Sequence, residues 1–303
     1  MTETFTLAHL TDVHLSPIAG FSPRYWNAKR GLGYVNWLRK RARIHQRTIA
    51  DKLITDAKTL RADHIAITGD LINLGLPAEY EAALAWLQSV GPAERVTVIP
   101  GNHDIYSALY GDIGIGRWAA YMGGDADTHA FPFVRRFGPV ALIGLNSAIE
   151  TPPFVAAGRL GPDQIEVTRD LLERLGDEGL ARVVLIHHPP LQGLAAARRG
   201  LRDVKPFQRM LEKTGAELVL YGHNHEPRLT WLETVAGRAA VIGGASASAG
   251  RLHGKEHLAQ YNVFTFFKSE ERLRIRQTVR GLEVPDGAVV KLSETVLELG
   301  AVD

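Results

Sequence analysis

The stretch Gly101-Asn102-His103-Asp104 is the part of the sequence from which the fold can be worked out. It directly follows residues 96–100, an apolar, β-branched run that ends in proline and is typical of a buried strand. The glycine lets the backbone bend sharply where the strand ends. The strand therefore delivers an amide oxygen, an imidazole and a carboxylate to one point, and these groups form a site only if other strands end in the same way.

Composition excludes several classes of protein. The 303 residues include 45% hydrophobic residues, enough for a sizeable core, and the net charge of +2 gives no global basic field that would attract nucleic acid. Cysteine is absent, which excludes disulfides, thiolate ligands and a cysteine nucleophile. No signal peptide and no apolar run long enough to span a bilayer is recognised. The expectation is a soluble cytoplasmic protein with no nucleic-acid partner.

Four other apolar runs also end in polar residues. The five runs cover residues 5–10, 64–68, 96–99, 182–186 and 217–221. In open α/β sheets, ligands bind beyond the carboxyl ends of the strands. The polar residues at these ends are Asp12 and His14, Asp70, Asn102 and His103, His187 and His188, and His223 and His225. Because five such ends in one chain hardly arise by chance, we interpret them as one site.

Strands and helices alternate up to residue 221, and a β-rich part follows over residues 227–303. Helical patterns cover residues 36–60, 77–90, 162–175 and 204–214, and the first has an inner face available in Leu38, Ile49, Leu53 and Ile54. Alternating runs in the later part predict strands at residues 228–235, 239–242, 262–267 and 273–279. The pattern predicts an α/β fold in which two sheets pack together with helices outside them. A single domain over residues 1–303 is expected, because the candidate site residues come from distant parts of the chain and must meet.

The donor types at the strand ends indicate a metal site. Imidazole, carboxylate and amide oxygens without sulfur suit first-row ions such as manganese, iron, cobalt, nickel or zinc. The candidate ligands are too many for one tetrahedral ion. Two ions that share a bridging carboxylate fit better, and such pairs lie about 3.5–4 Å apart in hydrolases of phosphate esters.

These motifs resemble those of the calcineurin-like metallophosphoesterase family, in the family's order. The matching motifs are Asp12-x-His14, Gly69-Asp70, Gly101-Asn102-His103-Asp104, His187-His188-Pro189 and Gly222-His223-Asn224-His225. The resemblance implies a four-layer α/β/β/α sandwich of two mixed sheets with flanking helices. It also implies two divalent or mixed-valence ions of manganese, iron or zinc as cofactors. Beyond residue 227 the chain matches only the family's β-rich ending.

The resemblance further implies a role for each motif residue. One metal would be held by Asp12, His14 and His225, the other by Asn102, His187 and His223, and Asp70 would bridge the two. His103 would face the substrate, stabilise charge on the phosphoryl group and protonate the leaving alkoxide. Asp104 would orient His103. His188 is expected to line the substrate pocket or to form hydrogen bonds there.

The charge of such a centre favours a phosphodiester. Two divalent ions, two carboxylates and one metal-bound hydroxide sum to about one positive charge, which matches one phosphodiester anion. The hydroxide would attack phosphorus in line while the metals offset the charge of the transition state. The sequence therefore predicts a phosphodiesterase that uses metal-bound hydroxide.

A basic stretch with interleaved aromatic residues spans residues 24–47. It contains Lys29 and Arg30, which we assign to the substrate pocket, and Trp26 and Trp37, whose side chains suit a membrane interface. A solvated basic helix face is the alternative interpretation. The segment resembles one found in a bacterial phospholipase C-type group of the family. That resemblance implies phospholipid head groups as substrates and peripheral contact with the anionic inner face of the membrane.

Other substrates and one other class of function stay open. The motifs resemble the family's bacterial phosphodiesterase branch, which includes enzymes acting on cyclic nucleotides and glycerophosphodiesters. A lipid A precursor pyrophosphatase is disfavoured because related enzymes carry arginine in place of His103, and a nuclease is disfavoured by the near-neutral charge. A non-catalytic binding scaffold is disfavoured because such scaffolds lose metal ligands, and none is missing here. The oligomeric state does not follow from the sequence.

The remaining histidines are interpreted as structural. His9 lies in the first predicted strand and is expected in or near the core, and His45, His64 and His129 belong to no motif. His253 and His257 lie in a later loop, from which a side chain could reach the pocket.

Overall fold

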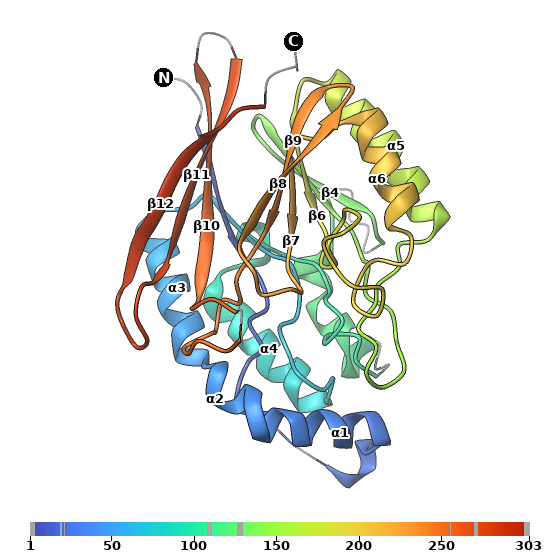
Figure 1. Ribbon diagram of the computed structural model, residues 1–303, viewed down its shortest axis with the longest axis vertical. Coiled ribbons are helices and arrows are strands. Elements are labelled where there is room, and N and C mark those ends of the chain that lie inside the picture. Colours follow the sequence, from blue (N-terminus) through green and yellow to red (C-terminus); the bar gives the residue numbers. More distant parts are fainter. Residues whose placement is uncertain are drawn as a thin grey trace.

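The computed structural model describes residues 4–18, 20, 22–107, 109, 111–125, 130–254, 256–269 and 272–299. Within these residues, twelve strands form two mixed six-stranded sheets with helices outside them (Figure 1). The predicted α/β architecture of two mixed sheets flanked by helices is thus confirmed. His129 lies outside the described residues.

The first sheet has the strand order β12-β11-β10-β1-β2-β3. Its members are β1 (Phe5–Leu10), β2 (His64–Ile67), β3 (Val96–Val98), β10 (Gln260–Ser269), β11 (Arg272–Leu282) and β12 (Val289–Leu297). β1, β2 and β3 are parallel, so their carboxyl ends lie at one edge, and β10, β11 and β12 extend the sheet in antiparallel fashion. The sequence runs did not predict β12, because its apolar residues do not alternate regularly with polar ones and most of this edge strand is exposed.

The second sheet has the order β4-β5-β6-β7-β9-β8. Its members are β4 (Phe133–Phe137), β5 (Val140–Gly144), β6 (Ala181–Leu185), β7 (Leu218–Tyr221), β8 (Arg228–Thr234) and β9 (Gly237–Gly243). The four central strands are parallel, and both edge strands are antiparallel to their neighbours. The central strands are buried on both faces. Val183 and Leu185 of β6 join the core between the sheets, whereas Val184 packs beneath the outer helices.

Helices cover the outer face of each sheet. The α-helices are α1 (Ala28–Asn36), α2 (Ala42–Ile44), α3 (Arg47–Thr59), α4 (Pro77–Val90), α5 (Pro162–Asp177) and α6 (Val204–Thr214). α5 and α6 lie along the second sheet, and α3 and α4 belong to the core of the first (Figure 1). Short 3-10 turns span Pro23–Tyr25, Ala93–Arg95, Gly111–Ile113 and Ile115–Met122. Within the described ranges, none of the helices combines the length and apolarity needed to cross a bilayer.

The continuous helix predicted over residues 36–60 is wrong. The chain instead forms α1, a π-helical segment over Trp37–Arg41, the short α2 and, after a break, α3. At the break His45 is extended, with φ −87° and ψ 115°, and it pairs with Ala249. Leu38, predicted for the inner face, is 50% exposed. Pairing with a distant loop therefore overrides the helical pattern, and it places residues 37–45 beside the strand ends described below.

Candidate metal centre

The residues predicted to bind metal all lie at the carboxyl ends of strands. β1, β2 and β3 of the first sheet and β6 and β7 of the second lead into them, so the site draws on both sheets (Figure 1). A non-glycine residue in the left-handed region costs about 1–2 kcal/mol, and such strain concentrates at functional sites. Five of the eight described non-glycine residues with positive φ are predicted ligands, namely Asp12 (52°), His14 (43°), Asp70 (57°), His223 (71°) and His225 (55°).

The first cluster consists of Asp12, His14 and His225. Nε2 of His225 lies 3.2 Å from Nε2 of His14 and 3.2 Å from Oδ1 of Asp12. Nδ1 of His14 donates to the carbonyl oxygen of Ile72 at 3.3 Å, so Nε2 of the neutral ring carries a lone pair. Nδ1 of His225 faces Glu256 Oε1 at 3.6 Å. The Nε2 atoms of both rings therefore converge beside a carboxylate oxygen.

The second cluster consists of Asn102, His187 and His223. Oδ1 of Asn102 lies 2.7 Å from Nδ1 of His223 and 3.2 Å from Nε2 of His187. The two ring nitrogens are 3.3 Å apart. Nδ1 of His187 donates to the carbonyl oxygen of Thr68 at 2.7 Å, which leaves the Nε2 lone pair for the cluster. This cluster repeats the arrangement of the first with an amide oxygen in place of the carboxylate.

Asp70 lies between the two clusters. Its Oδ2 is 3.5 Å from Nε2 of His187 and 3.8 Å from Nε2 of His14, while Oδ1 accepts the backbone N–H of His103 at 2.7 Å. The close approach explains the preceding glycine of the tetrapeptide, since a Cβ on Gly101 would collide with Oδ1 of Asp70. One carboxylate therefore faces both groups of ring nitrogens.

The residues present fit two metal ions. Two ligands at about 2.1 Å from one ion lie roughly 3.0–3.4 Å apart, and two of the three distances in each cluster are 3.2–3.3 Å. Buried Oδ1 of Asp12 has no hydrogen-bond partner among the described residues, although it faces two histidines. Such an unpaired carboxylate oxygen beside converging lone pairs is explained by a cation.

Electrostatics also indicate a place for positive charge. Burial opposes protonation of His187 and His225, yet Asp70 raises the pKa of His187 to about 9, and Asp12 raises that of His225 to about 9. Burial likewise opposes ionisation of Asp70, but His187 holds the pKa of this carboxyl well below its usual range. The carboxylates thus stabilise positive charge at both clusters, as metal binding requires.

His103 lies beside the clusters and is not bonded to either. Its Nδ1 donates to the carbonyl oxygen of Asn73 at 2.6 Å, and its Nε2 accepts from Nη1 of Arg41 at 2.7 Å. Burial and the cationic Arg41 lower the pKa of His103 to about 3. Within the described residues, Arg41 has no carboxylate within ion-pair distance. The pair therefore presents the positive charge of Arg41 to the site, with Asp70, Glu256 and Asp12 near enough to act on it but not paired with it.

Asp104 does not orient His103, contrary to the prediction. Its buried carboxylate makes no hydrogen bond to the His103 ring, which the carbonyl oxygen of Asn73 positions instead. The Asp104 oxygens accept four backbone hydrogen bonds of 2.8–3.2 Å, from Asp70, Leu71, Ile72 and Gly101. Asp104 thus ties the loop after β2 to the loop after β3.

The structure does not bring Lys29 and Arg30 into the pocket to which they were assigned. Nζ of Lys29 bonds to the carbonyl oxygens of Tyr106 and Thr151. Arg30 is buried, and its guanidinium donates to four carbonyl oxygens at 2.7–3.1 Å, those of Tyr25, Leu74, Gly75 and Ser107. Both side chains fasten α1 to the loops that carry the site.

His188 is also placed away from the pocket surface. It is fully buried behind His187 and His223, and its Nδ1 hydrogen-bonds to Ser147 Oγ at 2.8 Å. Burial and the neighbouring His187 lower its pKa to about 3. The hydrogen-bonding alternative therefore describes His188 better than the pocket-lining one.

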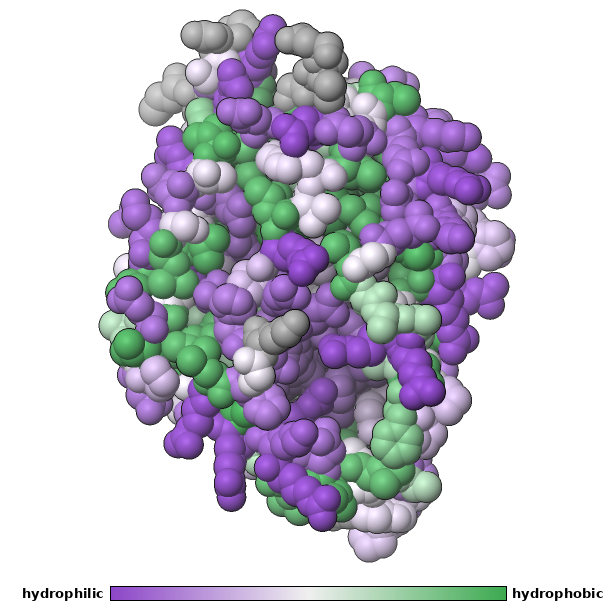
Figure 2. All heavy atoms as spheres, viewed as in Figure 1, coloured by the Kyte–Doolittle hydropathy of each residue, from purple (hydrophilic) through white to green (hydrophobic). Residues whose placement is uncertain are grey.

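A cavity of about 260 Å³ opens onto the two clusters. Figure 2 shows this face, where hydrophilic side chains gather around a hollow near its centre. The predicted residues on its wall are Asp70, Asn102, His103, His223 and His225, together with His253, which the sequence allowed to reach the pocket; the further residues include Lys40, Arg41, His45, Arg199 and Glu256. Basic side chains predominate among the additions, so the cavity suits an anion.

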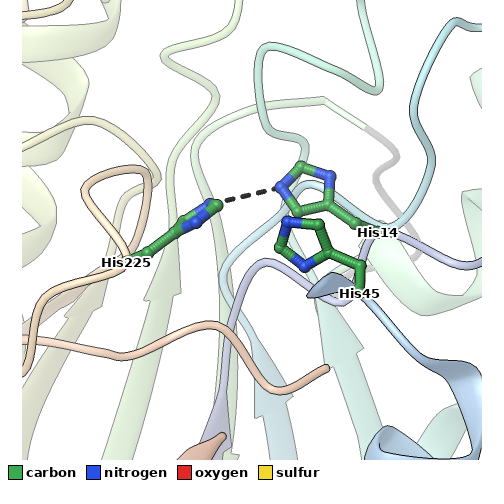
Figure 3. A group of neighbouring side chains, drawn as sticks. All are labelled: His14, His45 and His225. Carbon is green, nitrogen blue, oxygen red and sulfur yellow. Dashed lines mark hydrogen bonds between the residues drawn. The ribbon is translucent and has the colours of Figure 1, made fainter. Parts of the chain in front are cut away.

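Arg41 and His45 are two wall residues that the sequence did not assign to the site. Arg41 ends the π-helical segment and His45 lies between α2 and α3, so both are far along the chain from any strand end. The His45 ring lies 4.7 Å from that of His14 and 5.5 Å from that of His225 (Figure 3). A π-helical turn is often found at functional sites, but no pattern in the sequence predicted one here.

The fold and the donor set are typical of metal-dependent phosphoesterases, and comparison with known proteins agrees. The profile described as "Calcineurin-like phosphoesterase" matches residues 5–227. The chain belongs to the calcineurin-like phosphoesterase family, whose members depend on two metals.

Similar proteins include one curated relative and several solved structures. The chain is 31% identical over 168 residues to a probable cyclic nucleotide phosphodiesterase of a Synechococcus species, and the match covers 54% of this chain and 58% of the relative. A dimetal phosphatase from Danio rerio shares the fold with a TM-score of 0.57 and 15% identity, covering 95% of this chain and 98% of that one. A 5'-nucleotidase precursor from Thermus thermophilus gives a TM-score of 0.49 at 14% identity, covering 98% and 55%.

Proposed function

We propose that this chain is a two-metal phosphodiesterase. The observation that carries the proposal is the position of Asp70, whose carboxylate faces a separate histidine cluster on either side. One metal is assigned to Asp12, His14 and His225, and the other to Asn102, His187 and His223. Bound there, the two ions would supply Lewis acidity toward the phosphoryl oxygens and lower the pKa of water. We also propose that residues 1–303 act as one domain, because both sheets supply ligands.

The chain's own residues would bind and orient the phosphodiester. Arg41 has no anionic partner within the described residues, and a phosphate oxygen would accept its N–H groups. Once Arg41 turns to the phosphate, Nε2 of His103 is released and faces the cavity, while the Asn73 carbonyl keeps the ring in place. His103 is then positioned to hold a proton for the leaving alkoxide. Lys40 and Arg199 add positive charge to the wall.

Phospholipid head groups are the substrates we propose first. Large apolar side chains are exposed on three of the segments that reach the cavity: Leu32, Val35 and Leu38 on the segment that ends in Lys40 and Arg41, Phe154 close to Ala156, and Leu252 beside His253. Exposed Arg39 and Arg43 lie on the same helical segment. Apolar side chains combined with basic ones suit an anionic lipid surface. A cyclic nucleotide is the second candidate, because the Synechococcus relative is named a probable cyclic nucleotide phosphodiesterase.

The test measures metals and hydrolysis on the same preparation. We expect two first-row ions per chain and faster hydrolysis of bis(p-nitrophenyl) phosphate than of p-nitrophenyl phosphate. Phosphatidylglycerol vesicles and 3',5'-cyclic AMP are then compared. Head-group release supports the lipid substrate, and turnover of cyclic AMP alone supports the second candidate. A protein with two bound metals that hydrolyses no diester contradicts the proposed activity.

Neutralising the exposed basic residues separates the two substrates further. In the double variant R39S/R43S we expect about 30-fold slower hydrolysis of dilute anionic vesicles, since each basic residue near a membrane contributes about 1 kcal/mol. Hydrolysis of bis(p-nitrophenyl) phosphate should be unchanged. The matched control is K268S/K291S, which removes the same charge from exposed strand positions of the first sheet. Equal loss in both double variants would contradict a specific lipid-binding face.

His103→Ala should keep both metals and lose turnover selectively. On an alkyl phosphodiester we expect a loss of about 10²–10⁴-fold, the usual contribution of a positioned acid. On bis(p-nitrophenyl) phosphate the loss should be much smaller, because p-nitrophenolate leaves without a proton. Kinetics on both substrates and metal analysis check this, with exposed His257→Ala as the control. Loss of a metal would place His103 in the wrong role.

A further inference from the structure

His45 is the buried histidine that the motifs leave without a role. It follows α2, at the point where the chain leaves the helix and pairs with Ala249. Its backbone N–H donates to the carbonyl oxygen of Arg41 at 2.9 Å, and the residue is only 2% exposed. Yet the residue contributes to the cavity wall. The backbone therefore holds His45 rigidly with part of its ring toward the site.

Two serines fix the orientation of the His45 ring. Nδ1 lies 3.0 Å from Ser248 Oγ and 3.2 Å from Ser246 Oγ. Ser246 gives its single hydroxyl proton to the carbonyl oxygen of Asp12 at 2.6 Å, so toward His45 it can only accept. Nδ1 therefore carries the ring proton, and Nε2 carries a lone pair. Ser246 also couples His45 directly to the loop of a predicted ligand.

The Nε2 lone pair points at the first cluster. Figure 3 shows the rings of His14, His45 and His225 grouped together, with one nitrogen of His45 directed between the other two rings. One nitrogen from each ring lies within 4.8 Å of those of the other two. Ligands on opposite sides of one ion are about 4.2 Å apart, so a shift of roughly half an ångström brings all three into range. Within the described residues, Nε2 of His45 has no hydrogen-bond partner.

We propose that His45 is a further ligand of the metal held by Asp12, His14 and His225. His14 and His45 each present an Nε2 lone pair in this buried place, and the described residues around them offer too few donors to satisfy both. A cation shared by all three satisfies each lone pair. The serine pair then acts as the outer hydrogen-bonding support that ligand histidines normally have. The inference rests on the two-metal centre proposed above. It gives one metal an additional histidine ligand that the other metal lacks.

This difference in ligands between the two metals gives a test that does not depend on activity. The protein is first stripped of metal with a chelator. Zinc is then titrated in competition with a chromophoric chelator, which yields both dissociation constants. A parallel sample is loaded with cobalt, whose absorption spectrum reports the coordination number. In His45→Ala we expect one site to weaken about 100-fold while the other is unchanged. The cobalt spectrum should intensify, because removing a ligand lowers the coordination number at one ion. His45→Asn, which keeps a donor oxygen, should restore part of the affinity.

The controls separate the inference from the proposed function. The wild-type protein should bind two zinc ions, and exposed His257→Ala should match it. If wild type binds no zinc, both the two-metal function and the role of His45 are overturned. If wild type binds two ions and both His45 variants bind them with wild-type constants, only the role of His45 is overturned. Equal weakening of both sites in His45→Ala and His45→Asn, with a lowered melting temperature, would also overturn it in favour of a packing role.

Discussion

Asp70→Asn is expected to lower the bound metal from two ions per chain to less than one and to abolish hydrolysis. The Asp70 carboxylate faces Nε2 of His187 at 3.5 Å and Nε2 of His14 at 3.8 Å, so both proposed metals depend on it. Asparagine removes one negative charge and replaces one donor oxygen with an N–H group that cannot ligate. We expect each metal to bind at least about 100-fold more weakly, which metal analysis and chelator competition measure.

The matched control is Asp51→Asn on α3. Asp51 is a half-exposed carboxylate that lies outside the cavity, pairs with Arg47 and accepts the indole N–H of Trp86 at 2.8 Å, for which asparagine keeps an acceptor oxygen. This variant should retain both metals and full hydrolysis, since a surface pair contributes at most about 1 kcal/mol. If Asp70→Asn holds two ions with unchanged affinity, a carboxylate shared by both metals is the wrong interpretation.

Asp104→Asn is expected to be the most destabilising polar substitution near the site. Asp104 accepts four backbone N–H groups and is fully buried. Asparagine offers one acceptor oxygen and points an amide N–H at donors that then lack a partner. Each buried donor left unsatisfied costs about 1–3 kcal/mol, so we expect unfolding to become easier by about 3–5 kcal/mol. Urea unfolding measures this change in the free energy of unfolding. Measurements with and without chelator separate the effect of lost metal from the effect of the lost hydrogen bonds between the loops.

Asp203→Asn is the matched control for this effect. Asp203 also accepts backbone N–H groups, from Leu160 and Gly161, but it is only half-buried and lies away from the cavity. Its substitution should cost less and leave metal affinity unchanged. A stable Asp104→Asn protein with a selective loss on poor leaving groups would instead support the original prediction that Asp104 orients His103.

The fold could be predicted from the sequence because its signals are local. Parallel strands buried on both faces appear as short apolar runs, and the helices α4, α5 and α6 follow the 3.6-residue pattern within two residues of the predicted ends. β12 was not predicted because the apolar residues of this exposed edge strand do not alternate regularly with polar ones. The long helix over residues 36–60 was wrong because the pairing of His45 with Ala249 depends on a loop two hundred residues away.

The sequence by itself determined which strand ends carry polar groups, and those ends converge because parallel strands present their carboxyl ends at one edge. Asp12, His14, Asp70, Asn102, His187, His223 and His225 are brought together for this reason. Only the tertiary structure decided how the surrounding charges are used. It turned Lys29 and Arg30 inward to backbone carbonyls, made Asp104 a link between loops, and placed Arg41 and His45 at the cavity. These roles depend on contacts between distant segments, for which a linear pattern contains no signal.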